Sequence, residues 1–163
     1  FNTSTTDTDI YIAVLNSLYV SILDVSFQRS GACIGILSKD KIYSSHGIIN
    51  DLDVISELDI LDKEKSYKSI VMKSVIAGKK FHELSRPLRQ EILSMDGATI
   101  IFDDGTILAV GAILKINSGS DGGGRRAAAR ALSKYGIGIK VSSDGQITIW
   151  HDPSHPESFE EIG

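Results

Sequence analysis

Apolar residues recur at helical spacing near the start of the chain, after a polar segment rich in Ser and Thr. Residues 1–9 form that polar segment, and we expect them to be a flexible N-terminal end. The apolar positions between residues 10 and 25 predict a helix that ends at Gln28, ahead of Gly31. Asn, Ser and Asp interrupt this apolar run. The pattern therefore favours a packed helix of a soluble protein, and we expect no membrane span in this segment.

The next elements are shorter and alternate between strand and helix patterns. Residues 32–37 are apolar and predict a buried strand that turns into a short partner strand at residues 42–43. Residues 67–76 fit either a strand or a helix, and their β-branched run favours a strand followed by a helix. Pro87 fits the first turn of a further helix, because the N–H that proline lacks has no partner there. We expect that helix to finish near Met95.

Turn residues divide the C-terminal half of the chain more clearly. An Asp-Asp-Gly and a Ser-Asp-Gly sequence each separate two apolar runs, so two hairpins are predicted. In order, we expect a strand at 98–102, a strand at 106–116, a flexible loop at 117–124, a helix at 125–135, a strand at 137–142, a strand at 146–150 and a mobile C-terminal tail at 151–163. This mixture indicates an α/β fold with a mixed, largely antiparallel central β-sheet flanked by helices. Residues 10–150 then form a single domain.

Composition narrows the class of protein. The chain has 163 residues, of which 42% are hydrophobic and 23% charged, as is typical of one globular domain. Its net charge of −4 argues against coating nucleic acid by bulk charge, and we expect no direct nucleic-acid binding. The single cysteine, Cys33, excludes an intramolecular disulfide and a Cys-based zinc site, and favours the reducing cytoplasm. Because the chain begins with Phe1, we interpret it as a piece of a longer protein.

Residues 46–66 carry an acidic cluster, which consists of Asp51, Asp53, Glu57, Asp59, Asp62 and Glu64. The spacing of these residues does not match a calcium-binding loop. A metal site would need the carboxylates to converge, so the pattern favours a solvated surface. The histidines, at positions 46, 82, 151 and 155, lack a partner acid at metal-ligand spacing, and we interpret them as surface or structural residues.

The first candidate motif is Asp96-Gly97-Ala98, at the junction of a predicted helix and a predicted strand. Gly97 and Ala98 have almost no side chain, so a ligand can approach the backbone closely. Asp96 is then able to bind a metal ion or to accept a proton from a hydroxyl group. The alternative is an ordinary turn before a strand.

The second candidate motif is the run Gly122-Gly123-Gly124-Arg125-Arg126, which leads into an Ala-rich helix. Glycine-rich backbone at a helix N-terminus presents free N–H groups to an anion, and arginines add donors suited to phosphate. Positive charge there is unfavourable unless an anion is present, which makes the pattern informative. The alternatives are a flexible loop with two solvated arginines and a weak match to a dinucleotide-binding loop.

The third candidate motif is Ser142-Ser143-Asp144, at the end of a predicted strand. Its hydroxyl groups and its carboxylate are suited to phosphate and to a metal ion. By itself, the same sequence is a favourable turn.

Taken in order, these motifs resemble those of the diadenylate cyclase domain, a nucleotide-binding domain found at the N-terminus of the DNA-integrity scanning protein and in membrane-linked cyclases. The resemblance is clearest over residues 95–150. It implies that Asp96 is catalytic at the reacting ribose 3′-hydroxyl and that Asp96 and Asp144 bind the metal. It implies nucleotide binding by the other motif residues, which are Gly97, Ala98, Gly122, Gly123, Gly124, Arg125, Arg126, Ser142 and Ser143.

The second and third motifs depart from the family pattern. Gly123 and Gly124 stand where the family's Gly-Thr-Arg-His-Arg has Thr and the first Arg, and Ser143 replaces the first Glu of the third motif. A charge-assisted contact contributes about 1.5–3 kcal/mol. The loss of two such donors therefore costs roughly 10²–10⁴ in rate. In this respect the chain resembles divergent members of the superfamily that act as nucleotide sensors.

The resemblance implies two alternative functions. As an enzyme, the domain would join two ATP molecules into cyclic di-AMP with release of pyrophosphate, using Mg²⁺ or Mn²⁺. Each site holds one ATP, so two copies of the domain would meet face to face in a homodimer or a higher homo-oligomer. As a sensor, the same pocket would bind ATP or a cyclic dinucleotide and signal to a further domain.

Overall fold

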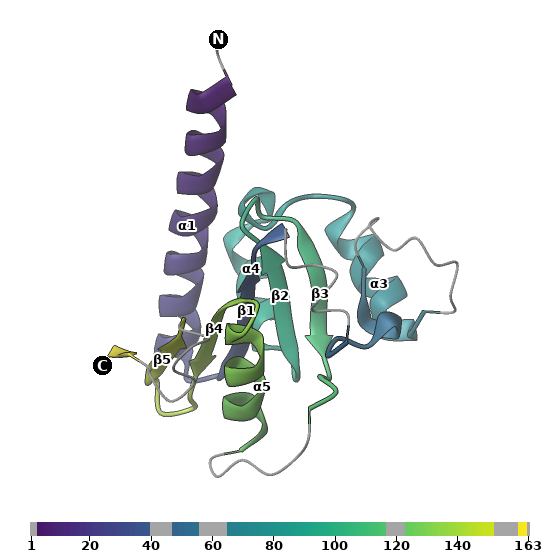
Figure 1. Cartoon of the computed structure of the whole chain (residues 1–163), viewed down its shortest axis with the longest axis vertical. Helices are drawn as coiled ribbons and strands as arrows, with labels where there is room; N and C mark the ends of the chain where they lie inside the picture. The colour runs from purple at the N-terminus through teal and green to yellow at the C-terminus, as the bar shows by residue number, and fades with distance from the viewer. Residues whose placement is uncertain (1–2, 40–46, 56–64, 117–122, 152–159, 163) are drawn as a thin grey trace.

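The computed structural model describes residues 3–39, 47–55, 65–116, 123–151 and 160–162. At its centre is a six-stranded sheet with the strand order β3-β2-β1-β4-β5-β6 (Figure 1). β1 and β2 are parallel, and all other neighbouring strands are antiparallel. The expected α/β fold with a mixed, largely antiparallel sheet is therefore confirmed. The strands are β1 (Ala32–Leu37), β2 (Ala98–Phe102), β3 (Ile107–Ala112), β4 (Gly136–Val141), β5 (Ile147–Trp150) and β6 (Glu160–Ile162).

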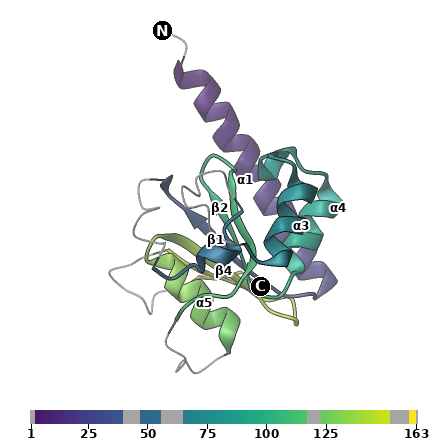
Figure 2. The ribbon, with the colours of Figure 1, turned by 90° about the vertical axis from the view of Figure 1, so that its right-hand side faces the viewer.

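Helices cover both faces of this sheet (Figure 2). α1 and α4 pack against each other on one face, and α5 packs on β1 and β4 on the other. α3 lies beside the edge strand β3, next to the short 3-10 helix η2. The helical elements are α1 (Thr3–Gln28), η2 (Asp51–Asp53), α3 (Tyr67–Ile76), η3 (Phe81–Glu83), α4 (Arg86–Ser94) and α5 (Gly124–Ser133).

Two hydrophobic clusters, one on each face of the sheet, form the core. Ile34 of β1 packs in the cluster that contains Val25 of α1 and Leu93 of α4. Its neighbour Cys33 packs in the other cluster, with Leu132 of α5. Successive residues of a strand point to opposite faces, so a strand that is covered on both sides is almost continuously apolar. This pattern explains why β1 has the bounds that the sequence predicts.

The first helix begins at Thr3, so the segment expected to be a flexible end is helical from that residue onward. Ser, Thr and Asp are weaker helix formers than Ala or Leu, but neither Gly nor Pro interrupts the chain before Gly31. The helix can therefore extend backwards from its packed half. It ends at Gln28 as predicted, and Arg29 follows with a positive φ of 55°.

The N-terminal half of α1 projects beyond the sheet (Figures 1 and 2). By length and composition alone, Thr8–Gln28 is long and apolar enough to cross a membrane. An 18-residue stretch of it has a mean hydropathy of 1.7, and 28% of that stretch is buried in the fold. One stripe of the helix is packed, as expected, through Val14, Leu18 and Val25. Other large side chains of the helix are exposed, among them Tyr11, Ile12, Leu15 and Tyr19.

Residues 67–76 form one helix, α3, and the expected strand at their start is wrong. The side chain of Ser66 caps the helix by accepting a hydrogen bond from the N–H of Ser69. Ala77 ends the helix in the left-handed conformation. β-branched residues cost a helix only a few tenths of a kcal/mol each, roughly, so a good cap and a buried Ile76 outweigh them.

The chain ends with an addition to the sheet. Within the segment predicted as a mobile tail, Glu160–Ile162 forms β6 and pairs antiparallel with β5. This three-residue strand is exposed, and two of its residues are acidic, which is how edge strands are commonly protected from further pairing. The strand predicted at residues 42–43 lies outside the described residues.

Candidate functional site

The turn that precedes β2 lies against an irregularity in β3. Gly97 has a φ of +98°, and Gly111 has a φ of +61°. The pairing of β2 with β3 shifts register between Ala98 and Ile100, as happens at a β-bulge. β3 ends directly afterwards, at Ala112, so the strand predicted to reach residue 116 is shorter than expected. The chain leaves the sheet at this point and turns towards α5.

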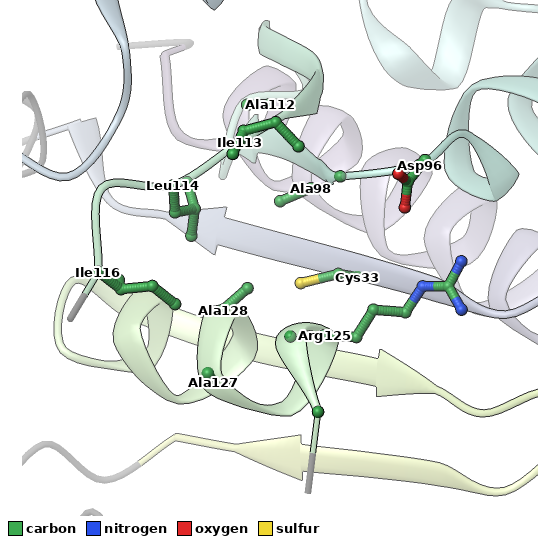
Figure 3. Close-up of a pocket in the computed structure, with 13 residues that line it drawn as sticks. Cys33, Asp96, Ala98, Ala112, Ile113, Leu114, Ile116, Arg125, Ala127 and Ala128 are labelled. Atoms are coloured by element: carbon green, nitrogen blue, oxygen red, sulfur yellow. The ribbon is translucent and has the colours of Figure 1, made fainter. Parts of the chain in front are cut away.

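A cavity of about 430 Å³ lies between this turn and the start of α5 (Figure 3). Because β1 and β2 are parallel, both strands begin at the same end of the sheet, where Cys33 of β1 pairs with Ala98 of β2. These two residues form the cavity floor. Residues 113–116 form one wall and the first turns of α5 the other. The lining residues are Cys33, Asp96, Gly97, Ala98, Ala112, Ile113, Leu114, Ile116, Gly123, Gly124, Arg125, Ala127 and Ala128.

Charged side chains line one end of the cavity. The side chains of Asp96 and Arg125 both stand at that end, on opposite walls (Figure 3). Asp96 is exposed, and in the described part of the chain it has no ion pair. The Nε atom of Arg125 is buried and has no hydrogen-bond partner among the described residues. This end therefore has both a carboxylate and a guanidinium group available for a ligand.

The opposite end is apolar. Ile113, Leu114 and Ile116 line it from one side, and Ala128 of α5 lines it from the other (Figure 3). Small residues at the start of α5 let the helix approach the sheet closely. The cavity thus has one end suited to charged groups and one suited to an aromatic ring or an aliphatic chain.

Three residues of the second sequence motif, Gly123, Gly124 and Arg125, line the cavity. Gly123 is the N-cap of α5, has a φ of +86° and provides no side-chain cap for the N–H groups of the first turn. A Cβ atom added to Gly123 or to Gly124 would meet no described residue within 4 Å. In the part of the chain that the structure describes, the first turn of α5 therefore has open space around these glycines. Gly122 lies outside the described residues, and Arg126 is half-buried and does not line the cavity.

The third sequence motif does not reach this cavity. Ser142, Ser143 and Asp144 form the turn between β4 and β5, in which Gly145 donates its N–H to the carbonyl of Ser142 at 2.9 Å. The carboxylate of Asp144 accepts a hydrogen bond from the N–H of Gln146 at 3.1 Å. The turn is tied to the end of α1, because Ser26 donates its hydroxyl to the carbonyl of Gly145 at 2.5 Å.

Asp144 consequently lines a separate shallow hollow together with Ser26 and Arg29. Asp144 and Asp96 therefore line different cavities, and the structure does not bring the two predicted metal ligands together in one of them. Among the described residues there is also no group of three or more His, Cys, Asp or Glu side chains that is arranged to hold a metal ion.

Lys68, which the sequence analysis did not single out, and Asp53 of the acidic cluster support the Gly111 bulge. Lys68 of α3 donates to the carbonyl of Gly111, and its Nζ atom lies 3.7 Å from Oδ1 of Asp53. Asp53 also accepts a hydrogen bond from the N–H of Ile113 at 3.2 Å through Oδ2. Asp53 is buried, so the prediction of a solvated acidic surface is wrong for this residue. The partners of Asp53 are remote in sequence, so no local sequence pattern indicates that this residue is buried.

Cys33 is a further cavity residue that the sequence analysis did not assign. It is 1% exposed, and its burial raises the pKa of the thiol to about 12, although the positive charge of Arg125 opposes the rise. The thiol is therefore protonated at neutral pH and behaves as a small apolar group in the cavity floor.

The comparisons with known proteins bear on the fold. No protein-family model matches the sequence, and no curated protein sequence matches it. The crystal structure of a hypothetical membrane spanning protein from Bacillus cereus aligns with a TM-score of 0.59 and 17% identity, over 91% of this chain. This chain covers 62% of that protein, less than two thirds of its length.

A crystal structure of DacA from Staphylococcus aureus, a double mutant, also aligns with this chain. Its TM-score is 0.51 at 19% identity, over 91% of this chain and 85% of that one. DacA is a diadenylate cyclase. Sequence identity this low carries the fold alone, and the aligned region includes almost the whole chain. The chain therefore has a fold of the diadenylate cyclase type, as the order of its sequence motifs predicts.

Proposed function

We propose that the cavity beside Asp96 binds an adenine nucleotide, and that two such domains join two ATP molecules into cyclic di-AMP. One observation carries the proposal: Asp96 and Arg125, which are far apart in the sequence, line one cavity in a fold similar to that of a diadenylate cyclase. The cavity volume of about 430 Å³ is in the usual range for small-molecule sites.

The two ends of the cavity suit the two ends of a nucleotide. A purine base would pack against Ile113, Leu114 and Ile116, because an aromatic ring gains free energy by leaving water for an apolar surface. The phosphates would then lie at the charged end. There Arg125 would donate to phosphate oxygens, together with N–H groups at the start of α5.

In the proposed reaction, the ribose 3′-oxygen of one ATP attacks the α-phosphorus of the ATP in the facing copy. The 3′-hydroxyl loses its proton, a P–O bond forms, and pyrophosphate leaves with the electron pair of the bond that breaks. A second attack of the same kind closes the ring. Asp96 would accept the hydroxyl proton. Since one cavity holds one ATP, the active species is a homodimer or a higher homo-oligomer.

A divalent cation, Mg²⁺ or Mn²⁺, fits the donors at the charged end of the cavity. Asp96 is an exposed carboxylate, and Mg²⁺ at nucleotide sites is typically held by one or two carboxylates together with phosphate oxygens. Asp96 is the cavity residue that would hold the ion. When bound, the cation would neutralise negative charge on the phosphates.

A nucleotide sensor is the second candidate function, and the start of α5 favours it. Gly123 and Gly124 provide no side-chain donors, and Arg126 does not line the cavity, so Arg125 is the one arginine among the described residues that line it. A site with few phosphate donors can still bind a nucleotide through its apolar end, but it stabilises developing charge in a transition state poorly. The sensor would then bind ATP or a cyclic dinucleotide without turnover.

The experiment that separates these functions is incubation of the protein with ATP and Mn²⁺, followed by chromatography for cyclic di-AMP and pyrophosphate. We expect both products from the wild-type chain at high protein concentration. Asp96→Asn should abolish product formation and leave ATP binding within about threefold, because the amide cannot accept a proton at neutral pH. ATP binding by the wild-type chain without product would reject the enzyme and support the sensor.

The two adjacent arginines provide a matched pair of variants. Arg125→Ala should weaken ATP binding at least tenfold, because a charge-assisted hydrogen bond contributes about 1.5–3 kcal/mol. Arg126→Ala removes the same charge from the neighbouring position, which does not line the cavity, and should weaken binding less. Equal losses in both variants would show only a general effect of charge. Unchanged affinity in Arg125→Ala would overturn the placement of the phosphates.

A further inference from the structure

A second cavity, of about 570 Å³, lies at the opposite end of the sheet from Asp96. It opens where β1 ends and β3 begins, and it is lined from one side by the C-terminal end of α3. It shares no lining residue with the cavity beside Asp96. Its lining residues are Lys39, Ile55, Lys73, Ile76, Ala77, Gly78, Lys79, Lys80, Thr106 and Ile107.

Four lysines and no carboxylate line this cavity in the part of the chain that the structure describes. Such a concentration of positive charge contrasts with the net charge of −4 of the whole chain. The lysines come from separate places, with Lys39 beyond the end of β1, Lys73 in α3, and Lys79 and Lys80 after α3. The fold therefore gathers charges that the sequence keeps apart.

The carboxylate of Asp104 compensates only part of this positive charge. Lys39 and Lys80 both contact the same oxygen, Oδ2 of Asp104, at 2.6 Å and 2.9 Å. These contacts hold the pKa of the Asp104 carboxyl far below its usual range, against the opposing effect of its burial. One carboxylate thus faces two ammonium groups. Lys73 and Lys79 form no ion pair with any residue that the structure describes.

The floor of the cavity is apolar. Ile55, Ile76 and Ile107 form it, and each of them belongs to the buried core. At the rim, Gly78 has open space around it, since an added Cβ atom would meet nothing within 4 Å. A ligand that combines negative charge with an apolar body would therefore find a partner for each part.

We propose that this cavity binds a small organic phosphate that carries at least two negative charges. Lysine ammonium groups are compact charges on flexible stems, so they can surround a phosphate in many orientations without the fixed geometry that arginine imposes. The anion would also relieve the repulsion between Lys39 and Lys80 around their shared carboxylate oxygen. The apolar body of the ligand would rest on the isoleucine floor and strengthen binding relative to inorganic phosphate.

The test uses calorimetric titration of the full chain with phenyl phosphate and with inorganic phosphate, which share the charged group and differ in the apolar body. All titrations are done with the Arg125→Ala variant, so that the other cavity contributes least. We expect phenyl phosphate to bind more tightly than inorganic phosphate. We also expect its affinity to fall as salt is added, because exposed charges are screened.

Lysine variants then locate the site. Lys73→Gln combined with Lys79→Gln should weaken phenyl phosphate binding at least tenfold, and the corresponding double change to Arg should retain it. Lys134→Gln, at an exposed position that does not line the cavity, is the matched control and should have no effect. Lys73 and Lys79 are exposed, so the double variant should keep its thermal midpoint. If the double variant loses that midpoint, each single variant is titrated, and each should weaken binding about threefold or more.

Three outcomes would overturn the proposal. The first is phenyl phosphate affinity that the Gln variants leave unchanged. The second is the absence of phenyl phosphate binding at low salt in a folded Arg125→Ala protein. The third is binding of an acidic peptide to these lysines with no binding of either phosphate, which would assign the surface to a protein partner. None of these outcomes depends on whether the cavity beside Asp96 binds ATP.

Discussion

Gly97 and Gly111 lie so close together that a methyl group added to Gly97 would fall 2.4 Å from the carbonyl carbon and oxygen of Gly111. Real Cβ atoms essentially never approach other atoms so closely. The reverse substitution is also crowded, since a Cβ atom on Gly111 would lie 2.8 Å from the carbonyl oxygen of Asp96. This contact fixes the turn that carries Asp96 against the bulge at the end of β3. One wall of the candidate site therefore depends on two glycines.

Gly97→Ala should destabilise the protein and weaken ATP binding. The substitution combines a positive φ of 98° with a steric clash, and each effect costs about 1–3 kcal/mol. Urea denaturation should therefore show a loss of about 2–6 kcal/mol in the free energy of unfolding. Gly78→Ala is the control, because Gly78 has a similar φ of +74° and open space around it. It should lose only about 1–2 kcal/mol. Equal losses in the two variants would contradict the clash.

Lys68→Met should destabilise the Gly111 bulge, which supports the same wall of the candidate site. The variant leaves the carbonyl of Gly111 without its ammonium donor and the buried carboxylate of Asp53 without its cation. We expect the free energy of unfolding to fall by about 1–3 kcal/mol. Asp53→Asn removes the charge on the other side of the pair. In a double-mutant cycle measured by urea denaturation, the two losses should be non-additive by about 0.5 kcal/mol or more. Strict additivity would show that the two side chains act independently.

The sequence predicted most of the fold because its strongest patterns are local. The hairpins β2–β3 and β4–β5 follow from β-rich runs separated by Asp-Gly turns, and Pro87 marks the first turn of α4. The error at α3 has a physical cause. Its β-branched residues Ile70, Val71 and Val75 resemble a buried strand in sequence, yet all three are exposed on the outer side of the helix. Burial, which a single sequence does not show, decides between the two structures.

The candidate site was predictable only in part. Asp96 and Arg125 stand in motifs, so residue type and spacing identify them, and the fold brings them to one cavity. Asp144 also stands in a motif, but the β4–β5 hairpin points its turn towards the end of α1. The direction of a hairpin depends on the whole sheet. Cys33 and Lys68 belong to no motif, and their roles arise from contacts with residues remote in sequence.

The thiol of Cys33 should react far more slowly in the native protein than in the unfolded protein. Burial raises its pKa to about 12, and the thiolate is the reactive form. At pH 8 the thiolate fraction is then roughly 10³-fold smaller than for an ordinary thiol. Reaction with a thiol reagent, followed by absorbance with and without urea, measures this ratio directly, since the chain has a single cysteine. A native rate close to the unfolded rate would show that the cavity opens frequently to solvent.

The contact between α1 and α4 includes an ion pair that should make stability depend on pH. Arg86 donates from Nε to Oδ2 of Asp24 at 2.7 Å and from its terminal nitrogen Nη2 to Oδ1 at 2.6 Å. These hydrogen bonds lower the pKa of Asp24, although burial opposes the shift. A carboxyl group whose pKa is lower in the folded state stabilises the fold above its unfolded pKa. That stabilisation is lost as the pH falls through the folded pKa.

Asp24→Asn should therefore destabilise the protein at pH 7 but not at low pH. The Arg86 side chain is 61% exposed, so solvent screening limits the loss at pH 7 to about 1 kcal/mol. The difference from wild type should shrink as the pH falls below about 4, near the unfolded pKa of an aspartate, because the unfolded wild-type chain then binds a proton that the folded chain binds only at a lower pH. Asp104, whose pKa is also lowered, is present in both proteins and cancels from the comparison. Glu91→Gln, an exposed acid on α4, is the control and should match wild type at both pH values. Urea denaturation at pH 7 and pH 3 measures both differences, and a loss of equal size at the two pH values would show that Asp24 acts through packing and not through its charge.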